Sequence, residues 1–501
     1  MIFNSIEFLI FFPIVLLVYY LIPNKVKHIW LLIASYYFYM SWNAKYALLM
    51  LIATVVTYFA GILITKFRYS GEERPIKIKK TKLVVVCSLG VTLGLLFYFK
   101  YSNFIIELID SILNKIGYKL NVPKFDIILP IGISFFTLQS IGYVIDVYRN
   151  KKVAEYDFFR YALFISFFPQ LIAGPIERST DLLRQLKHPK KFDFYRIRDG
   201  FLLMLWGFFL KIVIADRIAI FVDTVYGDYN TYGGLYLVVA TVLFAFQIYC
   251  DFAGYTTIAM GSARMLGIDL IDNFNAPYLS RSISEFWRRW HISLSTWFRD
   301  YLYIPLGGSQ YPREYKYKIY INKFLTFLIS GLWHGANLTF VIWGGLNGLF
   351  QVIEETTQPL RDKVTKTLQL NKESFSHKLL QTIGTFVLID FTWIFFRAET
   401  CTDAFNIIKS MVTVYNPWIL LDGSLYTCGL DMRNYWVMTN GIILLMLVDA
   451  CKYNNIIVRK FITKQDYWFR WILVSVSIVL ILTLGIWGPE YIANNFIYFQ
   501  F

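Results

Sequence analysis

The chain of 501 residues is 56% hydrophobic and only 17% charged, and its mean hydropathy is +0.48. A soluble protein of this length carries more charge, and apolar runs of membrane-spanning length recur throughout, so the composition excludes a series of soluble domains. The formal net charge of +15 matches the Lys and Arg excess of cytoplasmic loops in membrane proteins and does not by itself indicate nucleic-acid binding. We therefore predict one all-α, polytopic integral membrane domain over residues 1–501.

The cysteines indicate neither a disulfide framework nor a metal site. They are odd in number, widely separated and free of CxxC spacing: Cys87, Cys250, Cys401, Cys428 and Cys451. The first apolar stretch, residues 6–22, lacks a basic n-region and a small-residue cleavage site. We expect it to stay in the membrane as a helix and not to be removed as a signal peptide.

Three closely spaced membrane helices are predicted at residues 6–22, 28–42 and 46–65. The loop that follows, residues 66–82, contains seven basic and two acidic residues. Because cytoplasmic loops are enriched in Lys and Arg, this loop is predicted to be cytoplasmic and the amino terminus extracytoplasmic.

The next segments alternate between regular spans and interrupted apolar sequence. A span is predicted at residues 83–99 and an interfacial helix at 103–116. Residues 130–148 and 168–178 are apolar but interrupted by proline and glycine. Non-helical backbone at membrane depth is tolerated only where protein or a water-filled cavity covers it. This pattern favours a re-entrant region or the wall of a funnel, although a proline-kinked helix end explains it equally well.

The remaining spans bring the total to roughly eleven at about 20 residues each. They are predicted at residues 201–221, 234–250, 341–353, 379–396, 437–451 and 468–487. The loop 184–198 is basic and predicted to be cytoplasmic. Asp251, just after one span, could be a functional carboxylate, but helix capping or helix pairing is the stronger interpretation.

The segment FWRRWHISLSTWFRDY, residues 286–301, is predicted to be one amphipathic helix. At about 100° per residue two stripes form. The polar stripe contains Arg288, His291, Ser295 and Arg299. The opposite, apolar stripe contains Phe286, Trp290, Leu294, Trp297 and Tyr301. Ser282 and Glu285 have capping-box spacing at its start, and Pro305 with the following glycines is expected to end it.

His334 lies in residues 324–343, whose composition is that of a membrane segment. An ionisable group at that depth is costly, so its default interpretation is functional. A histidine titrating near neutral pH is suited to act as a general base or acid. Gly331 and Gly335 are expected to leave room for a substrate to approach the ring. The structural alternative is that His334 donates a hydrogen bond to a neighbouring helix.

His291 and the cations beside it have two interpretations each. His291 could assist His334 or could simply bond to a backbone carbonyl. Arg288 and Arg299 could hold phosphate groups or extend to lipid headgroups. The histidines lack the HxxxH and HExxH spacings of a helical metal site, and no GxSxG, P-loop or GxGxxG motif is present. The candidate catalytic residues are therefore His334 and His291, with no metal.

The motifs SISEFWRRWHISLSTWFRDYLYIPLGG, residues 282–308, and LWHGA, residues 332–336, closely resemble those of membrane-bound O-acyltransferases. The resemblance is greatest to the branch that O-acetylates alginate and peptidoglycan. Further similar stretches occur in the family's order, and they are PIGISFFTLQSIGYVIDVYR, FPQLIAGPIER, YCDFAGY, NFNAPYLS and the terminal FIYFQF. Many relatives have an aspartate where this chain has Thr257, so no role of that carboxylate is carried over.

The resemblance implies a helical membrane fold with a central tunnel, and it maps the family's two site positions onto His334 and His291. It implies no bound cofactor but a cytoplasmic thioester donor, acetyl-CoA, with delivery of the acetyl group to a polysaccharide outside a bacterial cytoplasmic (inner) membrane. It also implies a separate extracytoplasmic SGNH-type acetyltransferase as partner. The candidate donor- and substrate-binding residues are Arg288, Ser295, Arg299, Trp287 and Asn337.

Three other functions fit the same residues, and one of them is a catalytically silent scaffold that recruits an extracytoplasmic partner and for which His334 is dispensable. Within the family, the alternative is D-alanyl transfer to teichoic acid. From another class, a transporter or flippase of an envelope precursor would use the histidines as a proton path. The enzyme interpretation requires that substrates reach His334 through a channel.

Overall fold

The computed structural model describes residues 1–118, 125, 129–172, 174–487 and 497, and every regular element in these residues is a helix. The predicted all-α class is therefore confirmed. Of the sequence motifs, the terminal FIYFQF lies outside the described residues except for Ile497. Six described helical segments are long and apolar enough to cross a membrane: Lys27–Arg68, Arg74–Lys115, Leu235–Met265, Phe375–Arg397, Met432–Tyr453 and Tyr467–Leu484. The chain is a multi-pass membrane protein, and the count of roughly eleven spans stays a prediction.

The chain divides into two compact units. The first comprises Met1–Phe201 and Ile258–Ile271, and the second Leu202–Thr257 and Asp272–Phe501. Two helices, α9 (Phe194–Phe208) and α11 (Leu235–Met265), run from one unit into the other. The single domain over residues 1–501 stays a prediction.

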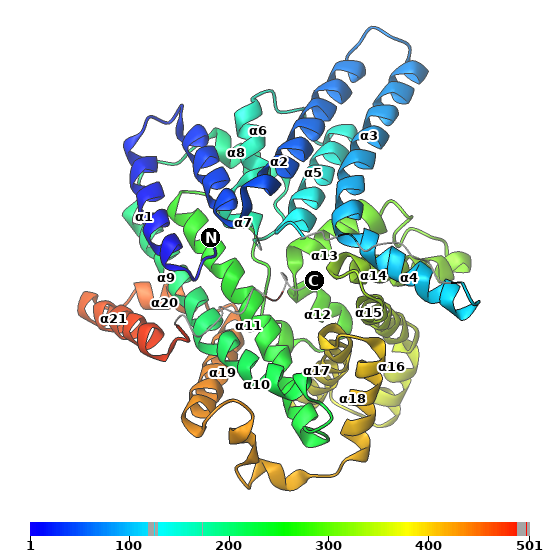
Figure 1. The fold of residues 1–501 in the computed structure, drawn as a ribbon, viewed down its shortest axis with the longest axis vertical. Coiled ribbons are helices and arrows are strands. Elements are labelled where there is room, and N and C mark those ends of the chain that lie inside the picture. The colour runs from blue at the N-terminus through cyan, green and yellow to red at the C-terminus, as the bar shows by residue number, and fades with distance from the viewer. Residues whose placement is uncertain (119–124, 126–128, 173, 488–496, 498–501) are drawn as a thin grey trace. The chain divides into compact units, whose positions relative to one another are not determined.

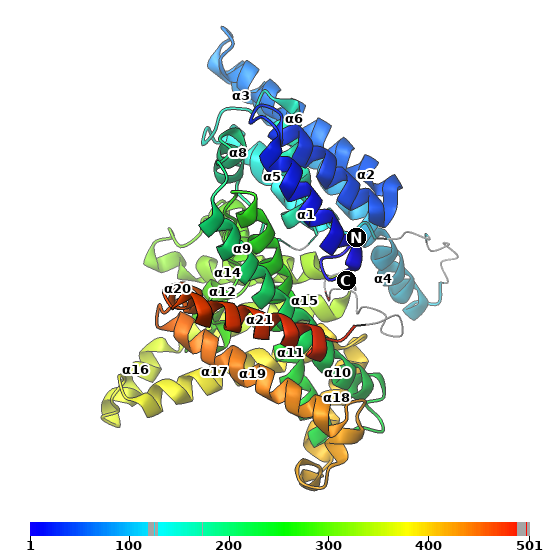
Figure 2. The same cartoon turned by 90° about the vertical axis from the view of Figure 1, so that its left-hand side faces the viewer.

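The first unit is built around α2, which packs against α3, α5 and α6 (Figure 1). Its helices are α1 (Ile6–Leu21), α2 (Lys27–Arg68), α3 (Arg74–Leu96), η1 (Phe97–Tyr101), α4 (Ser102–Lys115), α5 (Ile133–Tyr148), α6 (Phe158–Ser166), α7 (Phe168–Leu171) and α8 (Ser179–Lys187). Asn43 has extended dihedral angles and kinks α2, so the predicted helices 28–42 and 46–65 are its two halves. Figure 2 shows α1 alongside α2.

The interrupted apolar segments behave differently from each other. Residues 133–148 form the uninterrupted helix α5, which begins after Gly132 in the left-handed region. In residues 168–178, helix is confined to the four residues of α7, and residues 174–177 are buried without helical structure. The non-helical backbone of the second segment is covered by protein, which agrees with both interpretations of that segment, and the re-entrant region stays a prediction.

The second unit contains both candidate histidines. Its helices after α9 are η2 (Phe209–Ala215), α10 (Asp216–Gly227), the first part of α11, η3 (Pro277–Leu279), α12 (Ile283–Arg289), α13 (Ile292–Phe298), η4 (Arg299–Tyr303), η5 (Arg313–Tyr315), α14 (Lys316–His334), α15 (Leu338–Thr356), α16 (Gln358–Thr367), α17 (Phe375–Arg397), α18 (Cys401–Thr413), η6 (Pro417–Leu420), η7 (Ser424–Thr427), α19 (Met432–Tyr453), α20 (Val458–Thr463) and α21 (Tyr467–Leu484).

The prediction of one membrane segment over residues 324–343 is wrong. The chain turns after His334, and α14 and α15 form a closely packed hairpin that places His334 at a helix end. The turn residue Asn337 caps α15, because its side-chain oxygen accepts a hydrogen bond of 3.1 Å from the Thr339 N–H. Composition alone could not locate this turn, since both helices are apolar.

Small residues allow α14 and α15 to approach each other. A Cβ atom at Gly331 would overlap the carbonyl oxygen of Phe340, and one at Gly344 would overlap that of Phe327. Similarly, a Cβ at Gly335 would overlap the Phe340 ring. The space that these glycines leave is therefore occupied by α15 and not by a substrate, contrary to the prediction from sequence.

Replacing Gly344 with alanine should destabilise this hairpin, because the clashing atom belongs to the backbone and cannot move aside. Overpacking of this kind costs about 1–3 kcal/mol. We expect a lower unfolding temperature for the detergent-purified Gly344→Ala variant. The matched control is Gly384→Ala in α17, where a Cβ meets nothing within 4 Å. Equal unfolding temperatures for the two variants would contradict the close packing.

Candidate functional site

The predicted continuous helix over residues 286–301 is interrupted at Trp290 and His291. Helix α12 ends at Arg289, α13 begins at Ile292, and His291 between them has φ of 43° in the left-handed region. That conformation is uncommon for a residue other than glycine, although histidine adopts it more often than most, and it costs free energy that the surroundings must supply. The predicted helix start is confirmed, since the Ser282 side chain accepts a hydrogen bond of 3.0 Å from the Glu285 N–H.

Residues 273–275, which we call the supporting segment, form hydrogen bonds with the backbone N–H and C=O groups that have no helical partner at the break. The Ile292 N–H donates to the Asn273 carbonyl oxygen at 3.0 Å, and the Ser293 N–H donates to Asn273 Oδ1 at 3.2 Å. On the other side, the Asn275 N–H donates to the carbonyl oxygen of Arg289 at 2.9 Å. Tertiary hydrogen bonds therefore replace helical ones, and sequence periodicity contains no sign of this exchange.

The break buries both Trp290 and His291. In a continuous helix these neighbours would point about 100° apart, whereas here their exposed fractions are 1% and 0%. Trp290 packs against Phe274 of the supporting segment, with ring centroids 5.0 Å apart. The residues expected on the apolar stripe, Phe286, Trp290, Leu294, Trp297 and Tyr301, are all buried.

The two histidines meet in one aromatic surrounding. Their ring centroids are 6.4 Å apart, and the exposed fraction of His334 is 4%. The rings around them form the aromatic cage, which comprises Phe252, Trp333, Trp343 and Phe396. Phe252 packs edge-on against His291 at 4.6 Å, and Trp343 packs edge-on against His334 at 5.0 Å. The structure thus brings together the two residues that the sequence singles out for chemistry.

Burial also sets the charge of one imidazole. His291 lies outside the six candidate spans, and desolvation lowers its pKa to about 3. A buried imidazole with such a pKa is neutral at physiological pH, because the apolar surroundings disfavour the charged form. His291 is therefore suited to exchange hydrogen bonds as a neutral ring.

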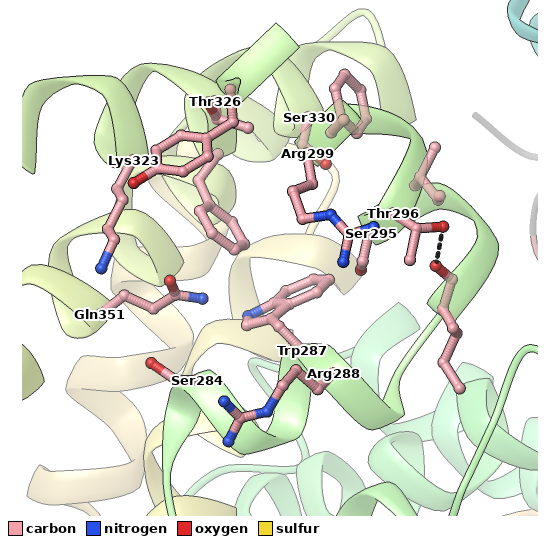
Figure 3. A pocket seen from close by; sticks show the side chains of 15 residues that line it. Ser284, Trp287, Arg288, Ser295, Thr296, Arg299, Lys323, Thr326, Ser330 and Gln351 are labelled. Atoms are coloured by element: carbon pink, nitrogen blue, oxygen red, sulfur yellow. Dashed lines mark hydrogen bonds between the residues drawn. The ribbon is translucent and has the colours of Figure 1, made fainter. Parts of the chain in front are cut away.

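A basic pocket opens beside the cage, with a volume of about 420 Å³ (Figure 3). Its lining residues come from α12, α13, η4, α14 and α15, and they are Ser284, Trp287, Arg288, Ile292, Leu294, Ser295, Thr296, Phe298, Arg299, Tyr303, Lys323, Thr326, Phe327, Ser330 and Gln351. In Figure 3 the head groups of Arg299 and Lys323 project into the space that Trp287 and Gln351 border. The volume falls in the range of small-molecule sites.

Three cations give the pocket its charge. Lys323 forms an ion pair with Glu355, and Arg299 Nε lies 2.8 Å from Asp300 Oδ1 on the exposed side. Arg288 is exposed and has no ion-pair partner among the described residues. Lysine and arginine head groups bind phosphate oxygens, so the pocket is suited to a phosphorylated ligand.

Neither histidine is among the described residues that line the pocket, although neighbours of both are. Ser330 lines it and precedes His334 by one turn of α14, while Ser295 lines it and follows His291 by one turn. Phe298 also lines the pocket, and it packs edge-on against Trp333 of the cage at 6.4 Å. The pocket lining and the cage are therefore in contact through Phe298 and Trp333.

The residues predicted to bind donor or substrate fall into two groups. Arg288, Ser295, Arg299 and Trp287 line the basic pocket, whereas Asn337 is not among its described lining residues. The Asn337 Nδ2 atom donates to the Glu399 carbonyl oxygen at 2.8 Å, in addition to the capping bond. Their roles in binding stay predictions.

The residues that α14 and α15 contribute to this pocket were not predicted from the sequence. Lys323, Thr326 and Ser330 occupy one face of α14 that continues to His334, and Gln351 lies on α15. Helical spacing counted backward from His334 would have found the α14 residues. Gln351 has no such signal, because the hairpin turn that brings it back is not visible in composition.

Asp251 is buried and forms an ion pair with Lys211. Its Oδ1 atom lies 2.6 Å from the Lys211 Nζ atom, which also lies 2.8 Å from Asp216 Oδ1. All three side chains are buried, and Asp251 Oδ2 accepts a hydrogen bond from the Ile497 N–H at 2.8 Å. This ion-paired setting favours the helix-pairing interpretation over that of a free carboxylate.

Comparison with known proteins identifies a family and named relatives. The profile of the membrane-bound O-acyltransferase family matches residues 149–396. A probable alginate O-acetylase of Pseudomonas aeruginosa is 38% identical over 84% of this chain and 76% of its own length. The peptidoglycan O-acetyltransferase of Helicobacter pylori is 33% identical over 82% of this chain and 80% of its own length. The teichoic acid D-alanyltransferase of Bacillus subtilis is 26% identical over 55% of this chain and 71% of its own length.

The low pKa of His291 predicts a pH-dependent stability. Below the ordinary imidazole pKa of about 6.5, the unfolded chain binds a proton that the folded chain does not, so stability falls as pH drops from there toward about 3. The loss approaches about 1.4 kcal/mol per pH unit. We expect denaturant unfolding to show a smaller loss for His291→Asn, which does not titrate and tolerates the left-handed region. Identical pH slopes would rule out a neutral His291.

Proposed function

The chain belongs to the membrane-bound O-acyltransferase family, and from this membership we propose that it transfers an acetyl group from cytoplasmic acetyl-CoA for O-acetylation of an extracytoplasmic polysaccharide. That the chain is an O-acyltransferase follows from the family. The choice of acetyl group and polysaccharide rests on relatives named for alginate and peptidoglycan O-acetylation, each aligned over most of both chains. The observation that supports the proposed mechanism is that two buried histidines lie beside a pocket with three cations.

In the proposed reaction His334 is the general base. Its imidazole takes the proton of an acceptor hydroxyl while that oxygen attacks the thioester carbonyl carbon. The tetrahedral intermediate then collapses, the C–S bond breaks, and the departing thiolate takes the proton from His334. A positioned general base contributes about 10²–10⁴-fold to the rate. The neutral His291 beside it orients the acceptor hydroxyl by a hydrogen bond.

The basic pocket is proposed to hold the nucleotide part of the donor. Coenzyme A carries a diphosphate and a separate 3′-phosphate, and the pocket supplies one cation from each of three elements: Arg288, Arg299 and Lys323. The hydroxyl and amide groups of Ser284, Thr326 and Gln351 offer further hydrogen bonds. The pantetheine arm would pass Ser330 and displace the Phe298 side chain from Trp333 to bring the thioester to His334.

The membrane arrangement of this proposal follows the distribution of charge. The basic segments 66–82 and 184–198, which comprise helix ends and the short turns between them, are placed in the cytoplasm, and the amino terminus is placed outside a bacterial cytoplasmic (inner) membrane. Donor and acceptor would meet at His334 through a tunnel open to both sides, gaining rate by proximity and orientation. An extracytoplasmic SGNH-type acetyltransferase is proposed as the partner that completes transfer to the polysaccharide.

D-alanyl transfer to teichoic acid is the second candidate, supported by the Bacillus subtilis relative. A carrier-protein donor presents a single phosphate on its phosphopantetheine arm. The alignment with that relative covers only 55% of this chain, whereas the relative named for alginate O-acetylation is aligned over 84% of it. The wider alignment favours the acetyl donor.

Replacing His334 with alanine tests the proposed base. In proteoliposomes supplied with radiolabelled acetyl-CoA, the extracytoplasmic partner acetyltransferase and the polysaccharide acceptor, we expect the variant to transfer acetyl groups about 10²–10⁴-fold more slowly than the unaltered protein. His188→Ala, an exposed histidine at the end of α8, is the control and should leave the rate unchanged. Transfer by His334→Ala at the normal rate would refute the mechanism. Transfer from D-alanyl carrier protein in place of acetyl-CoA would select the second candidate.

Replacing Arg288 with glutamine tests the donor pocket. Losing one charge-assisted hydrogen bond of about 1.5 kcal/mol should raise KM for acetyl-CoA roughly tenfold, with a smaller change in kcat. Lys366→Gln, an exposed cation on α16, removes the same charge away from the pocket and should leave KM unchanged. If both variants alter KM equally, or neither does, the phosphates bind elsewhere.

A further inference from the structure

We propose that Asn273 is a positioning residue that holds the helix break at Trp290 and His291, and so fixes the His291 imidazole beside His334. The inference rests on the proposed function in one respect, since it assigns both imidazoles to the reacting groups. Asn273 itself lies at no substrate-lined surface. Its exposed fraction is 0%, and it is not among the described residues that line the basic pocket.

The contacts of Asn273 are directed at the residues that follow His291. Its carbonyl oxygen accepts the Ile292 N–H, and its Oδ1 atom accepts the Ser293 N–H. These are the first two backbone donors of α13, which a helix start leaves without partners inside the helix. A single asparagine therefore caps α13 from a distant part of the chain, while His291 occupies the N-cap position without a capping bond from its own side chain.

The position of His291 depends on this support because its backbone is strained. A non-glycine residue in the left-handed region costs of order 1–3 kcal/mol, and the surroundings must supply that amount. Without the Oδ1 bond, the Ser293 N–H could return to a helical partner, and residues 289–292 could relax toward a continuous helix. The His291 ring would then leave its place against Phe252, which it now contacts edge-on at 4.6 Å.

The side chain of Asn273 uses only one of its two polar ends. Among the described residues, the Nδ2 atom is buried without a hydrogen-bond partner, whereas Oδ1 makes the bond to Ser293. The acceptor oxygen is therefore the functional end for positioning. Aspartate retains an acceptor oxygen at the same place, and alanine removes it. Comparing the two substitutions therefore tests whether the hydrogen bond to the Ser293 N–H is what matters, and not the amide group of asparagine.

The kinetic test compares Asn273→Ala with Asn273→Asp in the acetyl-transfer assay. We expect Asn273→Ala to lower kcat at least tenfold while KM for acetyl-CoA changes less than threefold, because the pocket's three cations, Arg288, Arg299 and Lys323, lie outside the residues that relax. Asn273→Asp should recover most of the lost kcat. A kcat within threefold of the unaltered protein for Asn273→Ala, or no recovery with aspartate, would overturn the proposal.

A matched control separates positioning from general stability. Asn416 also supports backbone with its side chain, since its Oδ1 accepts the Leu235 N–H at 2.8 Å and its Nδ2 donates to the Gly233 carbonyl oxygen at 3.0 Å. Asn416→Ala should lower the unfolding temperature without lowering kcat. If Asn416→Ala and Asn273→Ala reduce kcat in proportion to their loss of stability, the role of Asn273 is structural only.

Hydrogen exchange provides a readout that does not depend on the identity of the donor. In the full-length protein in nanodiscs, Asn273→Ala should accelerate amide exchange in the peptide containing Ile292 and Ser293, and Asn273→Asp should not. Unchanged exchange in Asn273→Ala would refute the positioning role even if acetyl transfer is confirmed. Faster exchange in a protein that does not use acetyl-CoA would instead support the positioning role and refute the proposed donor.

Discussion

The hydrogen bonds between residues 273–275 and the break in the helix are the constraint on which the site depends. They allow a chain with strong helical periodicity to stop after Arg289 and restart at Ile292, leaving His291 in a strained conformation. The break places His291 inside the aromatic cage, and the turn after α14 places His334 there as well. The site is thus assembled at two helix ends, where the backbone can depart from regular geometry.

The second unit contains two different environments close together, the polar basic pocket and the apolar aromatic cage. The basic pocket has cations, hydroxyl groups and a partly open surface, which suit a charged and hydrated ligand. The cage has tryptophan and phenylalanine rings around imidazoles that are almost fully buried. In a low-dielectric environment, hydrogen bonds and partial charges act more strongly than in water. The charge that develops on a reacting carbonyl would therefore be stabilised more in the cage than in the pocket. Ser295 and Ser330 mark the boundary between the two.

Much of this arrangement was predictable from sequence, and the parts that were not have physical reasons. Composition predicted the helical membrane class, and the rarity of histidine in apolar sequence selected His291 and His334. Periodicity failed at Trp290, because long-range hydrogen bonds from Asn273 outweigh local helical preference. Hydropathy failed at the turn after His334, because a tightly packed hairpin is as apolar as a single span. Gly331 and Gly344 were visible as small residues, but their packing partner was not.

A donor in the basic pocket is proposed to deliver its thioester to His334. A cryo-EM structure in nanodiscs with an acetyl-CoA analogue whose thioester cannot react would test this delivery. We expect phosphate density against Arg288 and Arg299, and the analogue's carbonyl within hydrogen-bonding reach of the two imidazoles, with the Phe298 ring displaced. Density elsewhere, or an analogue in the pocket with Phe298 and Trp333 still closing off His334, would contradict it.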